Sequence, residues 1–275
     1  MEATGWLEMP GLTGEEDFVG TCYAGGKRNY SYHYDRKMFT SMWTAYPLYA
    51  DTVGGNFKET QWNVNPEVDP SKQIDVGGPY DVNVGSTDSD DYTSAKPYYA
   101  RGHNIPDADR DNDAEMLAQT YFWTNSTPQI HSGFNSGIWS SLEGAVRNEI
   151  PAGDTLYVVT GAAFNKVGEN RSVTYITPKS ETKACPVPNY YWKALLKVKR
   201  SGTAIEKAYA IGFWLEHRSY SATTNNERYY DYAVSIDELE RNLGIDLFVN
   251  LPEAREADAE VASDWTAFTK ALKEE

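Results

Sequence analysis

The sequence predicts an α+β protein in which helices flank a central, mainly antiparallel β-sheet. Apolar and aromatic runs of strand length recur along the chain, while helical periodicity is confined to a few short stretches. Residues 190–199 and 208–217 form two such runs, and Ser201-Gly202 between them favours a hairpin. With 275 residues, 40% of them hydrophobic, the chain is long enough for a substantial core. We therefore expect one domain over residues 1–275, with peripheral termini at 1–20 and 252–275.

The first hundred residues are expected to be scaffold. Residues 6–10 predict a short edge strand that ends at Pro10. Residues 28–35 and 39–49 are rich in aromatic side chains and favour strands or a hairpin. Residues 51–95 are rich in turn formers and predict a long irregular excursion. The acidic residues at 88, 90 and 91 lack the EF-hand pattern, so a solvated acidic turn is favoured over a calcium loop.

The second half of the chain supplies the remaining strands. Residues 155–164 (TLYVVTGAAF) are almost continuously apolar, which is typical of a buried central strand, and residues 173–176 form another strand-like run. Ser235 and Glu238 have the spacing of a capping box, which predicts a short helix from there through Asn242. An acidic helical tail is expected to follow.

Residues 100–147 hold the side chains most suited to chemistry. Arg101-Gly102-His103 follows a strand-like aromatic run, and 125–129 and 134–137 are polar and turn-forming. Residues 138–149 read as a helix whose apolar side chains at 139, 142 and 146 share one face. Glu143 and Arg147 are four residues apart and are therefore neighbours on that helix. One histidine, one asparagine, one glutamate and two arginines thus have a route into a common site.

This arrangement resembles the DNA/RNA non-specific endonucleases of the ββα-metal nuclease superfamily. That family carries Asp-Arg-Gly-His, then Thr-Asn-x-x-Pro-Gln, then Asn-x-Gly-x-Trp-x-x-Leu-Glu with an arginine one helical turn later. The matching residues here are 101–103, 124–129, 135–143 and Arg147, in the same order and at the same spacing. The leading aspartate of the family is Ala100 in this chain. Segments resembling the family's strands extend the likeness over most of residues 20–250.

The resemblance implies hydrolysis of phosphodiester bonds in DNA and RNA, with a ββα-metal motif at the site. His103 would be the general base, because a neutral imidazole accepts the proton of a water molecule near physiological pH. Asn135 would bind a hard divalent cation, Mg²⁺ or Mn²⁺ or Ca²⁺ in its place, since such ions keep several waters and need few protein ligands.

The other four residues complete the expected site. Glu143 would hold metal-bound waters. Arg101 and Arg147 would donate to phosphate oxygens, and Asn125 together with Arg147 would contact the substrate. Gly102 lets the backbone bend beside the base.

Most of these residues also have an ordinary structural interpretation. Asn135 suits an N-cap of the helix that follows it, and Asn125 suits a simple turn former. Glu143 and Arg147 suit an exposed ion pair on the helix surface. Trp139 is expected in the core, and we assign no chemistry to His131 and His217. Arg28 and Arg36 either reach the phosphate or, as we favour, form structural or surface pairs.

The charge of the chain is unevenly distributed. The net charge of −15 argues at first against a nucleic-acid partner. Residues 96–200, however, hold 12 Lys and Arg against 10 Asp and Glu, whereas the rest of the chain holds 13 against 30. The acidity is therefore in the flanks of the sequence. Tight non-specific binding is not expected from so few phosphate contacts, and rapid release would suit turnover.

Two cysteines, Cys22 and Cys185, allow one disulfide and no zinc cluster. A bridge between them is one expectation, and two unpaired buried thiols are the alternative. With the family resemblance, a bridge would favour a secreted or periplasmic enzyme whose signal peptide is absent from this sequence. We expect no membrane span, because no apolar run approaches about 20 residues. The alternative functions are a non-catalytic nucleic-acid-binding relative of the same fold and a nuclease toxin domain.

Overall fold

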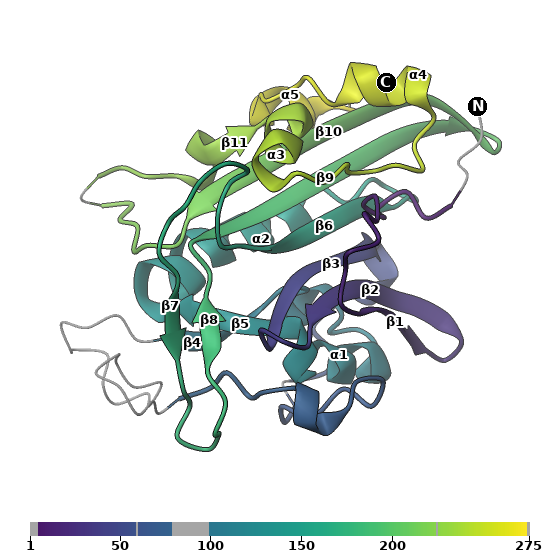
Figure 1. Ribbon diagram of the computed structural model, residues 1–275. Coiled ribbons are helices and arrows are strands. Elements are labelled where there is room, and N and C mark those ends of the chain that lie inside the picture. The colour runs from purple at the N-terminus through teal and green to yellow at the C-terminus, as the bar shows by residue number, and fades with distance from the viewer. Residues whose placement is uncertain (1–4, 59, 79–98, 224, 274–275) are drawn as a thin grey trace.

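The computed structural model describes residues 5–58, 60–78, 99–223 and 225–273, and the acidic residues at 88, 90 and 91 lie outside them. Seven strands form a fully antiparallel central sheet in the order β1-β2-β3-β6-β9-β10-β11 (Figure 1). These strands are β1 (Val19–Ala24), β2 (Lys27–Asp35), β3 (Thr40–Leu48), β6 (Leu156–Ala163), β9 (Tyr190–Ser201), β10 (Ala204–Glu216) and β11 (Ala233–Val234). The predicted α+β class and antiparallel sheet are confirmed.

Two small antiparallel pairs and five α-helices complete the regular structure of the described residues. The pairs are β4 (Tyr99–His103) with β5 (Ser126–Ile130), and β7 (Thr174–Ile176) with β8 (Cys185–Val187). The helices are α1 (Ala114–Thr120), α2 (Ser140–Arg147), α3 (Ile236–Leu243), α4 (Glu253–Ala259) and α5 (Trp265–Lys270). The β4–β5 pair followed by α2 has the order of a ββα unit.

The core lies on both faces of the sheet because side chains alternate along each strand. On β9, Tyr191 and Leu195 face one apolar cluster, which also contains Leu142 and Val146 of α2. Trp192, Ala194 and Leu196 face a second cluster, which contains Ile236 and Leu239 of α3. Helix α2 therefore covers one face and α3 the other (Figure 1). The predicted central strand 155–164 is β6, the fourth of the seven strands.

The N-terminal region agrees with the sequence in its hairpin and differs in its first segment. The expected strands at 28–35 and 39–49 are β2 and β3, which pair antiparallel. The expected edge strand at 6–10 is wrong, because this segment is a turn whose Leu7 and Glu8 are buried. The edge strands of the sheet are β1 and β11 instead. The turn is held in place by side chains, so the segment needs no strand partner.

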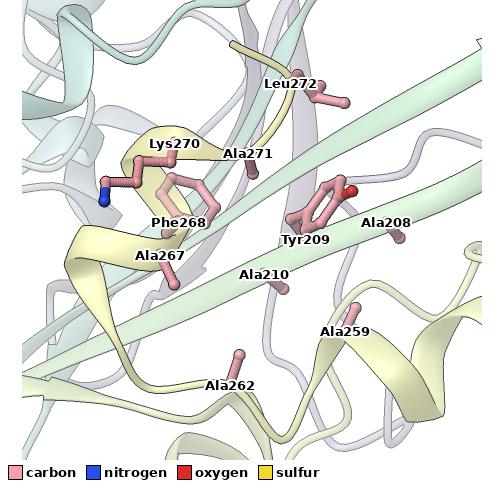
Figure 2. Close-up of a pocket in the computed structure, with 10 residues that line it drawn as sticks. All are labelled: Ala208, Tyr209, Ala210, Ala259, Ala262, Ala267, Phe268, Lys270, Ala271 and Leu272. Carbon is pink, nitrogen blue, oxygen red and sulfur yellow. The ribbon is translucent and has the colours of Figure 1, made fainter. Parts of the chain in front are cut away.

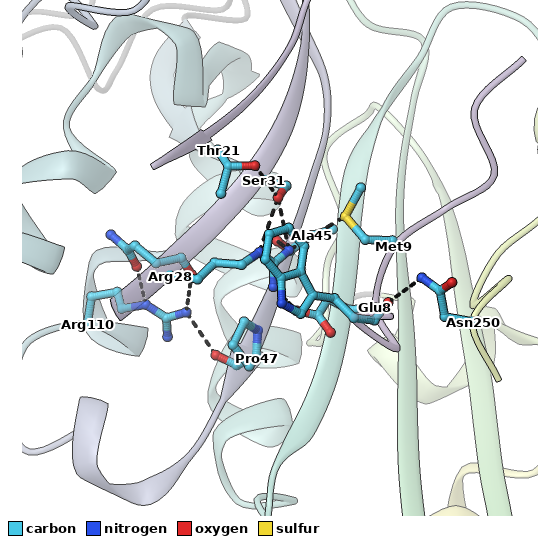
Figure 3. Close-up of polar contacts among 11 residues, drawn as sticks. Glu8, Met9, Thr21, Arg28, Ser31, Ala45, Pro47, Arg110 and Asn250 are labelled. Atoms are coloured by element: carbon cyan, nitrogen blue, oxygen red, sulfur yellow. Dashed lines mark hydrogen bonds and ion pairs between the residues drawn. The ribbon is translucent and has the colours of Figure 1, made fainter. Parts of the chain in front are cut away.

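Arg28 holds that turn against the sheet. Its guanidinium pairs with Glu8 and donates to the backbone oxygen of Ala45 at 3.0 Å (Figure 3). The guanidinium of Arg36 donates to Asp17 at 2.8 Å. The structural interpretation of both arginines is confirmed by these pairs, and neither is a candidate phosphate ligand.

The C-terminal segment wraps around β10. The predicted cap of α3 is confirmed, since the Ser235 hydroxyl accepts a hydrogen bond from the Glu238 amide at 3.1 Å. Further along, Ala259 and Phe268 are buried on opposite sides of the sheet. Between β10 and α5 lies a cavity of about 430 Å³ whose walls are mostly alanine side chains (Figure 2). None of the candidate site residues lines it.

The expected disulfide is wrong. Cys22 and Cys185 are both free and buried, and they belong to different apolar clusters. Burial raises the pKa of each thiol to about 12, so both remain protonated and unreactive. The cysteines therefore do not support an extracytoplasmic location, because no disulfide links them. Separately, none of the described helices has the length and apolar character to cross a membrane.

Candidate active site

The strand pair β4–β5 presents Arg101 and His103. In the antiparallel register His103 lies opposite Ser126, and Gly102 lies opposite Thr127. A Cβ atom at Gly102 would come within 2.2 Å of the Gln129 side chain, so only glycine fits between the two functional residues. The family's glycine at this position therefore has a packing reason in this chain.

His217 holds β5 in place from the central sheet. The amide of Ile130 donates to Nε2 of His217 at 2.7 Å, and Nδ1 of His217 lies 2.8 Å from the oxygen of Pro188. Burial lowers the pKa of His217 to about 4, so the ring stays neutral and can accept the amide proton. These two contacts give His217 a structural role.

The imidazole of His103 is enclosed by aromatic rings. The Trp62 ring centroid lies 4.6 Å away, and the Tyr121 ring meets the imidazole edge-on at 4.9 Å. Nε2 is buried and has no hydrogen-bond partner among the described residues. Burial lowers the pKa of His103 to about 4, and the negative charge of Asp107 opposes that shift. The ring is therefore neutral at physiological pH.

Arg101 is oriented by a carboxylate from the irregular excursion. Its Nε and Nη2 atoms donate to the two oxygens of Asp75 at 2.5 and 2.8 Å. The guanidinium also lies 5.9 Å from the Trp62 ring centroid. Both side chains of the ion pair are partly exposed, so Arg101 stays within reach of solvent. The excursion thus contributes two residues to the site that sequence reasoning did not assign.

Asn125 does not face solvent. Its side-chain nitrogen donates to the oxygens of Ile105 and Thr120, at 3.0 and 2.8 Å, and its side-chain oxygen accepts from the Ile105 amide at 3.0 Å. The residue is fully buried. The expected substrate contact is therefore corrected to a positioning role, in which the amide fixes the backbone that follows His103.

Asn135 lies in an irregular helical segment, His131–Trp139, that precedes α2 and contacts β4. Its side chain is half-buried and makes no hydrogen bond to any described residue. The alternative that Asn135 is the N-cap of the helix is wrong, since α2 has no side-chain cap. A neutral amide oxygen without a protein partner is a hard donor that suits Mg²⁺ or a similar cation.

Glu143 and Arg147 do not form the ion pair that their spacing suggests. Nη1 of Arg147 donates instead to Oδ1 of Asp109 at 2.9 Å, and the Tyr46 hydroxyl donates to Oδ2 of Asp109 at 2.8 Å. Burial raises the pKa of Glu143, while the positive charge of Lys193 opposes that shift. The helix pair is therefore part of a larger buried group of charges.

The structure brings three of the six predicted residues, His103, Glu143 and Arg147, into one electrostatic neighbourhood. The charge of Asp107 acts on both His103 and Glu143, although these lie on different elements. Asp107, Asp109 and Lys193 escaped sequence reasoning, as did Trp62 and Tyr121. The acidic residues that follow the histidine motif in the sequence could have pointed to Asp107 and Asp109. No periodic signal marks the others, and the catalytic roles of the predicted residues stay predictions.

The chain matches a known family over most of its length. The model of the DNA/RNA non-specific endonuclease family matches residues 19–254. A nuclease of Syncephalastrum racemosum is 28% identical over 61% of this chain, and the match covers 52% of that nuclease, about half its length. A nuclease of a Nostoc species is 28% identical over 82% of this chain and 73% of its own.

The fold has a counterpart among solved structures. EndoG, in the crystal structure of its complex with EndoGI, superposes with a TM-score of 0.67 at 18% identity, covering 87% of this chain and 90% of the other. At that identity the likeness concerns the fold alone. The family match includes the β4–β5 pair, α2 and all seven strands of the central sheet in full. This chain belongs to the DNA/RNA non-specific endonuclease family.

Proposed function

We propose that this protein is a divalent-metal-dependent endonuclease that hydrolyses phosphodiester bonds in DNA and RNA with little sequence preference. The observation that carries the proposal is the neutral, enclosed imidazole of His103 on a ββα unit that also holds Asn135, Glu143 and Arg147. Family membership supports the reaction class.

His103 would accept the proton of the attacking water. Hydrolysis needs a base that is unprotonated at the working pH, and burial keeps this imidazole unprotonated. As the ring gains the proton it becomes cationic, and the nearby charge of Asp107 favours that form. The aromatic walls exclude bulk water, which strengthens this attraction.

Two arginines would bind the phosphate. Arg101 and Arg147 each use part of the guanidinium on a carboxylate, Asp75 and Asp109 respectively. A guanidinium has five N–H donors, more than one carboxylate can accept from, and its planar donors match phosphate oxygens. The carboxylates fix the orientation of the arginines before substrate arrives, which lowers the entropy lost on binding.

The family is one of divalent-metal-dependent nucleases, and we propose Mg²⁺ as the ion, with Mn²⁺ or Ca²⁺ able to take its place. Asn135 would hold the ion through its side-chain oxygen, and Glu143 would orient ion-bound water. When bound, the ion supplies positive charge to the phosphate and to the leaving oxygen.

One acidic cluster of the surface lies away from the site. Asp237, Glu240 and Glu260 cluster at α3 and the end of α4, and α3 covers the sheet face opposite α2. Repulsion of nucleic acid by this cluster therefore acts away from the site. Weak overall attraction favours rapid release of polymer product.

The experiment is incubation of plasmid DNA and of RNA with the purified protein, with Mg²⁺ and with EDTA. We expect cleavage of both polymers that EDTA stops and that the His103→Ala protein lacks. Binding of nucleic acid without cleavage under any divalent ion would instead identify a non-catalytic relative of the fold.

We also propose a secreted or periplasmic location. The support is the resemblance to the bacterial members of the family, since the cysteines give none. Fractionation of the source cells with an antibody against the protein tests this, and a purely cytosolic signal would contradict it.

A further inference from the structure

Lys193 is a buried cation that the proposed mechanism does not use. It lies on β9 and is completely inaccessible, and its Nζ atom has no hydrogen-bond partner among the described residues. On the same strand, Tyr191 and Leu195 face α2, so the alternation of β9 directs Lys193 to the same side. A buried ammonium without a partner is costly, so a nearby negative charge must stabilise it.

The surroundings of Lys193 identify that negative charge. Nζ lies 5.0 Å from the ring centroid of Trp139, and Glu143 follows Trp139 by one helical turn on the same face of the helix. The pKa of Lys193 is lowered by burial, and the charge of Glu143 opposes this more than that of Asp109 does. Glu143 is therefore the carboxylate that acts most strongly on the ammonium.

The other charges nearby already have partners. Arg147 is hydrogen-bonded to Asp109, and Tyr46 completes the partners of that carboxylate. Glu143 has no salt-bridge or hydrogen-bond partner among the described residues, so Lys193 is the positive charge left to balance it.

We propose that Lys193 is a positioning residue whose buried charge favours the carboxylate form of Glu143. This inference rests on the proposed function for its catalytic consequence. Lys193 cannot reach a substrate itself, because its ammonium is buried, so it acts through Glu143. The groups that face Glu143 are Lys193 from β9, Arg147 from α2, Asp107 and Asp109 from the loop after His103, and Tyr46 from β3.

The balance among these groups makes Glu143 sensitive to the loss of one charge. Burial and the two aspartates favour its protonated form, whereas Lys193 and Arg147 favour the carboxylate. Removing the ammonium leaves Arg147, which is shared with Asp109. Glu143 should then take up a proton at higher pH than in the wild type.

The test replaces Lys193 by methionine, which has a similar length and no charge. Lys197→Met is the matched control, because Lys197 is also buried on β9, four residues along the same face, but pairs with Glu149 at 2.6 Å. The measurement is the NMR titration of the Glu143 carboxyl carbon. We expect its midpoint to rise by about one pH unit or more in Lys193→Met and to stay unchanged in Lys197→Met. An unchanged midpoint in Lys193→Met overturns the proposal.

Activity gives a second readout. At pH 7 Lys193→Met should lose about 5- to 50-fold in kcat, because a rise of one to two units from a pKa of about 7 lowers the ionised fraction of Glu143 by that factor, and activity should recover at higher pH. In a Glu143→Gln background the same change should cost no more than about twofold. An equal loss in both backgrounds would mean that Lys193 does not act through Glu143. Because the titration needs no catalysis, an inactive protein with the expected shift would refute only the proposed function.

A further variant tests whether a failure of Lys193→Met to fold comes from the loss of charge. If Lys193→Met does not fold, the double variant Lys193→Met/Glu143→Gln removes both members of the pair and should fold, because no buried charge is left without a partner. A double variant that also fails to fold would show that Lys193 is needed for packing alone, which overturns the proposal.

Discussion

The indole ring of Trp62 lies 4.6 Å from the imidazole of His103, centroid to centroid, and makes the proposed base a buried group. Trp62 comes from the irregular excursion between β3 and β4, while His103 ends β4. The contact matters because burial, more than any charge, sets the pKa of the imidazole at about 4. The excursion is thus part of the site's electrostatics.

Replacing Trp62 by alanine should raise the pKa of His103 toward its ordinary value of 6.5, because water would then solvate the imidazolium. The measurement is an NMR titration of the His103 ring. Trp62→Phe is the control, since it keeps an aromatic cover, and its shift should be much smaller. A pKa that stays near 4 in Trp62→Ala would show that Tyr121 and the surrounding backbone desolvate the ring without help.

The pH dependence of His103 follows from the sign of its shift. Because its pKa is lower in the folded protein than the usual 6.5, the neutral ring contributes stability above about pH 6.5, and this is lost as pH falls toward 4. Catalysis should likewise lose its base only near pH 4. The kcat/KM profile of Glu143→Gln isolates this step, since it removes the carboxyl group of the proposed site whose pKa is raised. A midpoint near 6.5 in that profile would contradict the assignment.

Replacing His103 by alanine should cut kcat by about 10²- to 10⁴-fold, the range typical for loss of a general base, with the fold retained. Circular dichroism and thermal unfolding check the fold. His131→Ala is the matched control, because His131 is partly exposed and has no assigned chemistry. A folded His103→Ala protein with an unchanged rate would remove this residue from the mechanism.

Replacing Asn135 by alanine should abolish most activity and weaken divalent-ion binding with little loss of stability, because its side chain makes no hydrogen bond to a described residue. Asn135→Asp should bind the ion more tightly, since a carboxylate adds charge. Calorimetric titration with Mn²⁺ measures both. Equal affinity in wild type and Asn135→Ala would exclude Asn135 as the ligand.

Replacing Asn125 by alanine should destabilise the protein by about 2–4 kcal/mol, since it leaves buried backbone groups of Ile105 and Thr120 without their partner. Urea unfolding measures this loss. The exposed Asn170 provides a control, and its alanine variant should be close to wild type. Loss of activity without loss of stability would instead restore a substrate-binding role for Asn125.

Much of the fold was accessible from sequence because it depends on local signals. Alternating and continuous apolar runs predicted β2, β3, β6, β9 and β10, and the spacing of Ser235 and Glu238 predicted the start of α3. The turn at residues 6–10 was mistaken for a strand, because an apolar pattern does not distinguish a strand from a turn held by a buried arginine. The predicted disulfide between Cys22 and Cys185 was wrong for a related reason, since the number of cysteines in a sequence does not give the distance between their sulfur atoms.

The sequence by itself determined the candidate catalytic side chains, because the motif fixes the types and the order of Arg101, His103, Asn135, Glu143 and Arg147. Only the tertiary structure decided how they are partnered. Arg147 is hydrogen-bonded to Asp109 and not to Glu143. The side chain of Asn125 is buried, and Lys193 on the central sheet faces α2. The partner of each charged side chain depends on which charges are buried together and shielded from water. That enclosure is set by long-range packing, and the periodicity of a single strand or helix does not record it.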